Sequence, residues 1–424
     1  MAKNNKNYVP LTISTLFERL GSIDAIVSKL GTDTSSWKSN EIGDGNLNMV
    51  FILTSPTGGV IVKQALPYVR LVGDSWPLPL KRAFFEYHAL IRQEKRDPGS
   101  VPKVYYFDED QAIIVMEFLT LHTILRNSLM AGKKVKGLAK TLGLFCARTL
   151  FRGSDLSMDT KERKADVALF VDNAELCDIT ETLIFSDPYF DAERNHHTPQ
   201  LDSIVAQLRN DVDLKVEAQH LKAKFCNNGE AMLHGDLHTG SVMVTDSEAK
   251  IIDPEFVLYG PMGFDVGMLL GNFWMAYFAQ PGHASTQGER AEYQNWILDV
   301  VDGIWKEFSI EFSRLWRNER TGILYEKSLF EDQGHALARE QALAHRLNDI
   351  WEDTLGFAGV EIIRRTLSLA HIAENEMIED EELRAACETC GLKLARQLVV
   401  NKSKINSMAS VNDLVKVIAM EKIL

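Results

Sequence analysis

The stretch "MLHGDLHTGSVMV" at residues 232–244, followed by "IIDPEF" at 251–256, decides the fold of this chain. Apolar segments bounded by short polar turns predict a small hairpin there. Asp236, Asp253 and Glu255 flank that hairpin. A single aspartate in a turn is usually explained by local capping of the backbone. Three carboxylates around one hairpin instead indicate a site that handles a metal ion or a proton.

Two kinds of chemistry fit these acids. In a phosphotransferase, Asp236 would orient an acceptor hydroxyl and take its proton late in the transfer. Asp253 and Glu255 would supply the hard oxygen ligands that Mg²⁺ prefers. In a metallohydrolase, His234, Asp236 and His238 would point to one side of an extended backbone as metal ligands. The phosphotransferase is favoured, because no second histidine-rich cluster with metal-ligand spacing accompanies the motif, and His234 is then a structural residue of the loop.

Length and composition set the class of protein. The 424 residues are enough for two domains or one large two-lobed domain. A hydrophobic fraction of 45% and a charged fraction of 25% are ordinary for a globular protein. The formal net charge of −13 argues against a nucleic-acid partner, because phosphate contacts need a basic face.

The sequence predicts neither a secretory signal nor a membrane span. The N-terminal "MAKNNKNYVPLTIST" lacks an apolar core of signal-peptide type. The most apolar window, Val266–Ala279, is too short to cross a bilayer and is expected to be a buried helix. The lone "CETC" at 387–390 has no partner pair for a zinc ion. We therefore expect a reduced, cytoplasmic protein with no membrane partner.

Hydrophobic periodicity divides the chain into two parts. "MVFILTSPTGGVIVKQA" predicts a β-hairpin, "KRAFFEYHALIRQE" a helix and "VPKVYYFDEDQAIIVMEFL" two more strands. A polar leader with one short amphipathic helix precedes them, so residues 1–119 are expected to form a small antiparallel sheet lobe. Residues 120–424 are expected to form a larger, mostly helical lobe, with helices at 141–151, 202–225, 290–316 and 335–371. The predicted fold class is therefore α+β and bilobal.

Two features of the first lobe suit a nucleotide. "EIGDGNLNMVF" at 41–51 carries Gly-x-Gly, but Asn48 stands where a third glycine would complete the fingerprint. It reads equally well as an ordinary hairpin turn and as a flap whose backbone N–H groups cover phosphates. Lys63 lies mid-strand just after this hairpin, either as a common edge-strand lysine or as a phosphate-binding one. Glu86, in the helix that follows, is its best candidate ion-pair partner.

Two features of the second lobe extend the site. Asp265 in "GPMGFDVGMLLGN" precedes an apolar helix, where it caps the helix, braces the loop around Asp236, or does both. Arg364 and Arg365 in "EIIRRTLSLAH" lie inside a predicted helix, where neighbouring side chains point about 100° apart. From the residues alone, a salt bridge to a nearby acid is favoured over a phosphate clamp.

Together these motifs resemble the S-methyl-5-thioribose kinases, small-molecule kinases of the methionine salvage pathway. The resemblance rests on "GDGNLN", "VKQALPYVR", "GDSWPL", "FSDPY", "LHGDLHTGS", "IDPEF", "GPMGFDVG" and "IIRR". It implies a bilobal protein-kinase-like fold and the ATP-dependent phosphorylation of the 1-hydroxyl of S-methyl-5-thio-D-ribose. The product would be S-methyl-5-thio-α-D-ribose 1-phosphate. Compared with protein kinases, Ser241 replaces an asparagine, and Glu255 offers a metal ligand that Asp-Phe-Gly lacks.

The resemblance also assigns residues. Asp236 would be the catalytic base and a substrate contact, and Arg364, alone or with Arg365, would bind substrate and stabilise the transferring phosphoryl group. Asp253 and Glu255 would hold Mg²⁺. The residues implied in ATP binding are Asn46, Lys63, Glu117, Phe118, Leu119, Asp253, Pro254 and Glu255. The segment 68–80, with Trp76, would cover the site, and a homodimer would be the working form.

Two other functions compete with this one. A kinase of an aminoglycoside or a choline-like alcohol shares the aspartate loop, but a cationic substrate needs an acid-rich or aromatic-walled site, which Arg364-Arg365 does not favour. A non-catalytic nucleotide-binding protein would explain Ser241 in place of asparagine. The retained Lys63, Asp236 and Asp253 argue against it.

Overall fold

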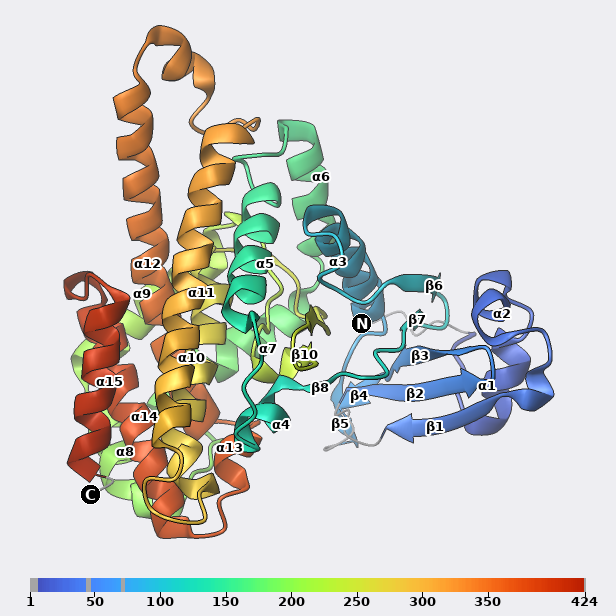
Figure 1. Cartoon of the computed structure of the whole chain (residues 1–424), viewed down its shortest axis with the longest axis horizontal. Coiled ribbons are helices and arrows are strands. Elements are labelled where there is room, and N and C mark those ends of the chain that lie inside the picture. The colour runs from blue at the N-terminus through green and yellow to red at the C-terminus, as the bar shows by residue number, and fades with distance from the viewer. Residues whose placement is uncertain (1–6, 43–46, 70–72, 423–424) are drawn as a thin grey trace.

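The computed structural model describes residues 7–42, 47–69 and 73–422 (Figure 1). Its first part holds a five-stranded antiparallel sheet with the strand order β1-β2-β3-β7-β6. These strands are β1 (Lys38–Ile42), β2 (Asn48–Ser55), β3 (Gly58–Ala65), β6 (Val104–Asp108) and β7 (Ile113–Glu117). A separate short ladder pairs β4 (Tyr68–Val69) with β5 (Gly73–Pro77). The predicted hairpin and the two later strands are confirmed, whereas β1 was not predicted.

The two faces of this sheet have different covers. Alternate strand residues such as Phe51 and Val62 are buried against α1 (Ile13–Leu20) and α2 (Asp24–Leu30). The opposite face, which includes Ile114, packs against α3 (Arg82–Arg96). The prediction of one leader helix was wrong, because the chain turns between α1 and α2. Since side chains alternate along a strand, Lys63 beside Val62 is directed to the α3 face.

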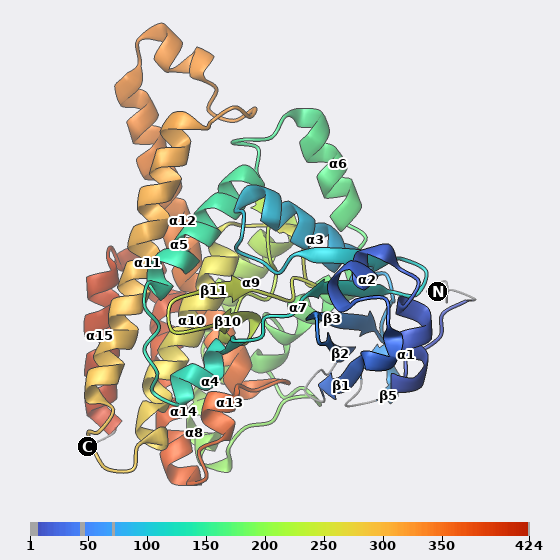
Figure 2. The same ribbon diagram turned by 45° about the vertical axis from the view of Figure 1, so that its right-hand side comes forward.

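The rest of the chain is mostly helical, as predicted (Figures 1 and 2). Its helices are α4 (Leu125–Met130), α5 (Leu138–Arg152), α6 (Thr160–Phe170), α7 (Ala174–Leu183), α8 (Asp202–Asn210), α9 (Val212–Asn227), α10 (Gly263–Ala279), α11 (Ala291–Asn318), α12 (Ala336–Leu367), α13 (Ala373–Glu376), α14 (Glu381–Asn401) and α15 (Met408–Lys422). Every residue of α10 is buried, which confirms the predicted core helix. The start of α12 and the segment that leads into it from α11 project beyond the other helices in both views. Among the described helices, none is long and apolar enough to cross a bilayer.

Two helix boundaries differ from the prediction. The helix predicted at 202–225 is broken into α8 and α9, because the Asp211 carboxylate caps the first turn of α9 by accepting from the Leu214 N–H. Helix α12 ends at Leu367, where Ser368 becomes extended. The break before α9 and the end of α12 both depend on local capping and backbone conformation, which the spacing of apolar residues does not predict.

Short strands carry the two acidic turns. β10 (Val242–Val244) pairs with β11 (Ala249–Ile251), which confirms a hairpin inside 231–252. β10 also pairs with β8 (Thr123–Ile124), while β9 (Ala231–Met232) pairs with β12 (Tyr259–Gly260). The loops on either side of the hairpin therefore start and end on paired backbone.

Candidate active site

Lys63 is the centre of one cluster of charges. Its Nζ lies 2.9 Å from Glu86 Oε1, which confirms the predicted ion pair, and it also contacts Asp253. Lys63 is only 8% exposed. Burial opposes its charge, but Asp253 and Glu86 more than offset that effect and raise the pKa of the amine above its usual value. The buried amine therefore stays positively charged, as a phosphate-binding group requires.

Glu86, Asp253 and Glu255 bring their carboxylates together. One oxygen of each lies within 4.8 Å of the others. Burial and the charge of Asp253 raise the pKa of Glu255, which is the effect of crowding acids in a buried site. Asp253 has a φ of 67°, an unusual value for a residue other than glycine, of the kind that collects at functional sites. A set of hard oxygen donors at this spacing fits Mg²⁺.

Glu255 is also tied to the sheet. Asn48 Nδ2 donates to its Oε2 over 3.3 Å, and Arg82 Nε lies 3.8 Å from the same oxygen. Arg82 in turn donates to Asn48 Oδ1 over 3.3 Å and to the carbonyls of Leu47 and Leu66. The sequence analysis missed both Asn48 and Arg82 as site residues. The sequence feature that could have identified Asn48 is its position, where the fingerprint would have a third glycine.

Asp236 lies between two basic side chains. Arg365 Nη2 donates to its Oδ1 over 3.0 Å, and His238 Nε2 lies 3.3 Å from its Oδ2. Burial raises the pKa of Asp236, but His238 and Arg365 outweigh it and hold that pKa well below the usual range. Asp236 also acts electrostatically on Asp253, so the two acidic turns adjoin. The side chain stays ionised and is 26% exposed, so a ligand can reach it.

Asp265 supports the loop that carries Asp236. Asp265 accepts from the backbone N–H of His234 over 2.6 Å and of Gly235 over 3.0 Å. This confirms the predicted brace, while the capping role was wrong, because Asp265 is the third residue of α10. A Cβ at Gly235, where φ is 86°, would lie 2.0 Å from the Phe256 carbonyl oxygen. Only glycine fits this close approach of the two acidic turns.

His234 and Ser241 are structural. His234 uses one nitrogen on the Ile252 carbonyl at 2.9 Å and the other on the Asp236 N–H at 3.3 Å. With both nitrogens engaged, it is not available as a metal ligand, which removes support for the metallohydrolase. Ser241 Oγ donates to the Asp236 carbonyl over 2.8 Å. The residue that replaces asparagine therefore supports the loop.

A closed ring of side chains holds Asp236 in place. Arg126 Nη2 contacts His238 Nδ1 at 3.3 Å and Asn272 Oδ1 at 3.5 Å, and Asn272 donates to Glu361 Oε1 over 3.2 Å. Glu361 accepts from Arg365 Nε over 2.6 Å. The ring thus runs through six side chains: Asp236, His238, Arg126, Asn272, Glu361 and Arg365. The sequence analysis named three of these six, Asp236 and Arg365 for phosphoryl transfer and His238 only as a ligand of the alternative metallohydrolase.

Arg364 differs from its neighbour. In the described part of the chain, its Nε and Nη1 have no hydrogen-bond partner. Burial and Arg365 lower its pKa to about 10, which still leaves it charged at neutral pH. Arg364 is thus a half-buried cation near Asp236 whose Nε and Nη1 have no protein partner among the described residues.

The other predicted residues follow β7, belong to the acidic turn, or lie outside the described residues. Glu117 ends β7, and Phe118 and Leu119 follow it directly in the chain. Pro254 is buried between the two acids of the turn. Asn46 lies outside the described residues, as does the Trp76 side chain.

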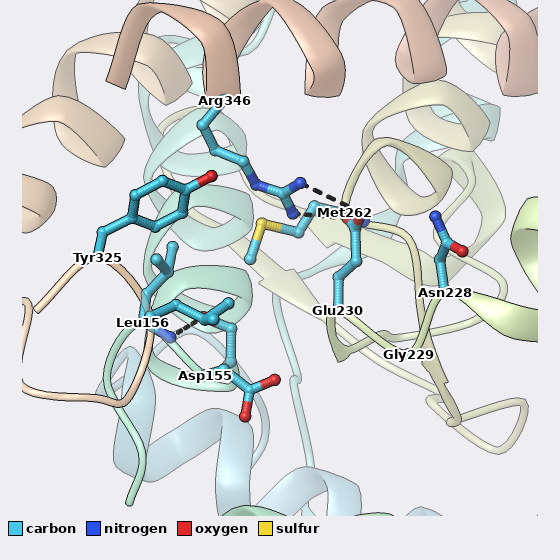
Figure 3. A pocket seen from close by; sticks show the side chains of 10 residues that line it. Asp155, Leu156, Asn228, Gly229, Glu230, Met262, Tyr325 and Arg346 are labelled. Carbon is cyan, nitrogen blue, oxygen red and sulfur yellow. Dashed lines mark hydrogen bonds and ion pairs between the residues drawn. The ribbon is translucent and has the colours of Figure 1, made fainter. Parts of the chain in front are cut away.

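A cavity of about 270 Å³ lies away from these acids, in the helical part of the chain (Figure 3). Its walls include Tyr325, Met262, Glu230 and Arg346. The side chains of Glu230 and Arg346 point toward one another, with Nη2 2.7 Å from Oε2. Because this arginine is already neutralised, the cavity is not a candidate phosphate site.

Comparisons with known proteins agree with this geometry. The model of the phosphotransferase enzyme family matches residues 39–298. A methylthioribose kinase of Escherichia coli is 44% identical over 97% of this chain and 98% of its own length. Methylthioribose kinase 1 of Oryza sativa is 39% identical over 96% and 95%, and one of a Geobacillus species is 41% identical over 96% and 98%. The chain therefore belongs to the phosphotransferase enzyme family and, within it, to the methylthioribose kinases.

Proposed function

We propose that this chain transfers the γ-phosphoryl group of ATP to the 1-hydroxyl of S-methyl-5-thio-D-ribose, giving S-methyl-5-thio-α-D-ribose 1-phosphate and ADP. The observation that carries the proposal is an ionised Asp236, held by Arg365, beside the turn that brings Asp253 to Lys63. The relatives named above, similar over almost their full length, suggest the acceptor.

The nucleotide would lie between the sheet and the acidic turn. Lys63 would bind its phosphates, Asn46 would contact them from the Gly-rich segment, and Glu117, Phe118 and Leu119 would face the adenine. Asp253, Pro254 and Glu255 form the turn that would carry Mg²⁺, with Asp253 and Glu255 as ligands. When bound, the ion would neutralise phosphate charge.

The acceptor hydroxyl would be aligned by Asp236. Its oxygen forms the new bond to the γ-phosphorus while the bond to the ADP oxygen breaks, and its proton passes to Asp236. An Asp236 with a lowered pKa is a weak base. That property suits a loose transition state, in which the proton leaves late and alignment matters more than abstraction. Arg364, two of whose nitrogens lack partners among the described residues, would bind the substrate or the phosphoryl group in transfer.

Three wider expectations accompany this function. We place the division between the lobes after Leu119, so that residues 1–119 and 120–424 close on the nucleotide. The homodimer rests on the family resemblance alone, and the cytoplasmic location stays a prediction. No nucleic acid or membrane is part of the proposal.

ADP formation measured against methylthioribose, choline and an aminoglycoside tests the acceptor. We expect turnover with methylthioribose alone, because the two guanidinium groups near Asp236, those of Arg364 and Arg365, disfavour a cationic acceptor. ADP formation with choline or the aminoglycoside and none with methylthioribose would overturn the assignment. The Asp236→Asn variant is the control for contaminating kinases.

A further inference from the structure

We propose that His238 is a positioning residue for Asp236, acting as a neutral imidazole that donates its Nε2 proton to Asp236 Oδ2. This inference rests on the proposed function, because it concerns the group that aligns the acceptor hydroxyl. The Nε2 to Oδ2 distance is 3.3 Å, at the long end of hydrogen bonding and of the kind that shortens when a ligand is bound.

The partners of the other ring nitrogen assign the tautomer. His238 Nδ1 accepts from the backbone N–H of Gly240 over 2.8 Å and faces Arg126 Nη2 at 3.3 Å. An N–H group and a guanidinium are both donors only, so Nδ1 has to carry a lone pair. The remaining proton of a neutral ring is then on Nε2, which faces the carboxylate of Asp236.

The surroundings keep the ring neutral. Burial, together with the positive charges of Arg365 and Arg126, lowers the pKa of His238 to about 4, against the opposing effect of Asp236. The imidazole of His238 also packs closely against Gly240, because a Cβ added to this glycine would lie 2.5 Å from the His238 Cε1. A glycine at position 240 thus lets the imidazole lie flat against the loop.

The two contacts of Asp236 fix its orientation. Arg365 donates to Oδ1 and His238 lies at Oδ2, so both carboxylate oxygens are held from opposite sides of the ring described above. Rotation about the Cβ–Cγ bond would break both contacts. The lone pairs left for the acceptor therefore point in one direction, which is the condition for efficient alignment.

A purely structural role offers the competing explanation. The same ring caps the short 3₁₀ turn Thr239–Ser241 through the Nδ1 contact with Gly240. Asparagine and glutamine separate the two roles, because Asn Oδ1 replaces Nδ1 as acceptor, whereas Gln Nε2 replaces the Nε2 donor. His238→Asn therefore keeps the cap and removes the contact with Asp236, whereas His238→Gln keeps the donor to Asp236.

We expect His238→Asn to keep the melting temperature of the wild type and the KM for ATP, while kcat falls by about 10²-fold because Asp236 is free to rotate. His238→Gln should recover most of that kcat, and in an Asp236→Asn background neither substitution should change the residual turnover. If His238→Asn retained wild-type kcat, or if both variants lost kcat equally, the positioning role would be overturned.

A spectroscopic measurement tests the tautomer without any turnover. The ¹⁵N shifts of the His238 ring should report a protonated Nε2 and an unprotonated Nδ1 from pH 5 to pH 8. A proton on Nδ1, or an imidazolium in that range, would overturn the inference. Failure of the acceptor assignment would leave this result unchanged, so the two proposals fail separately.

Discussion

Asn48 Nδ2 lies 3.3 Å from Glu255 Oε2, although the two residues are 207 positions apart in the chain. The contact joins the first residue of β2 to the acidic turn after β11. Arg82 bonds to Asn48 and lies beside the same carboxylate. The orientation of this glutamate is therefore set by the sheet as well as by its own loop.

Glu255→Gln should weaken the dependence on Mg²⁺. Glutamine keeps the size of the side chain and can still accept from Asn48, but it lacks the charge that a hard cation prefers. We expect the Mg²⁺ concentration for half-maximal ADP formation to rise by about tenfold or more. A titration identical to that of the wild type would remove Glu255 from the metal site.

Asp236→Asn should separate nucleotide binding from transfer. The amide fits the same space beside Arg365 but cannot accept the hydroxyl proton. We expect kcat to fall by about 10²- to 10⁴-fold, with ATP affinity by calorimetry unchanged. Near-normal turnover would show that Asp236 is not the base.

Removing Arg364 and removing Arg365 should have different effects on the free energy of unfolding. Arg365 is buried and pairs with Glu361 and Asp236, so Arg365→Ala should lower the free energy of unfolding by about 3–5 kcal/mol. Arg364→Ala removes nitrogens without protein partners in the described residues, so its effect on stability should stay within about 1 kcal/mol while turnover falls. Urea unfolding and ADP formation on both variants check this. Equal stability losses would contradict the distinction.

Glu388 should make stability depend on pH. This buried glutamate on α14 accepts from Thr198 Oγ1 over 2.8 Å, and burial raises its pKa to about 7. A carboxyl whose pKa is higher in the folded state contributes stability below its unfolded pKa and loses it as pH rises through the folded value. Glu388→Gln should therefore match the wild type near pH 4.5 and exceed it by up to roughly 3 kcal/mol at pH 8.

Urea unfolding at a series of pH values checks this prediction. The exposed Glu379, just before α14, offers a control. Glu379→Gln should follow the wild type at every pH. A Glu388→Gln variant that shows a constant difference from the wild type would refute the pKa argument.

Much of the fold was readable from the sequence because it is encoded locally. Two apolar runs separated by a Pro/Gly turn predicted the β2–β3 hairpin, and one unbroken apolar run predicted α10. Asp236, Asp253 and Glu255 were readable because they flank one hairpin within a short stretch. The pairing of Lys63 with Glu86 also followed, since α3 comes soon after β3 in the chain and packs on the sheet.

The rest of the site depends on tertiary contacts. Arg126 and Asn272 reach Asp236 only through His238 and Glu361, and no spacing rule connects residues of α4, α10 and α12. For Arg365 the salt bridge that the residues favoured is confirmed, because its guanidinium pairs with both Glu361 and Asp236, while the phosphate clamp stays a prediction.

The ring around Asp236 has a consequence for the newly synthesised chain. Ribosomes add about 5–20 residues per second, so Arg365, which lies 129 positions after Asp236, is added roughly 6–26 s later. Before the end of that interval, the residues of the sheet, Lys63 and both acidic turns have been added, but Asp236 still lacks its contact with Arg365. A nascent polypeptide can therefore acquire the parts for nucleotide binding before it can direct the phosphoryl group to an acceptor.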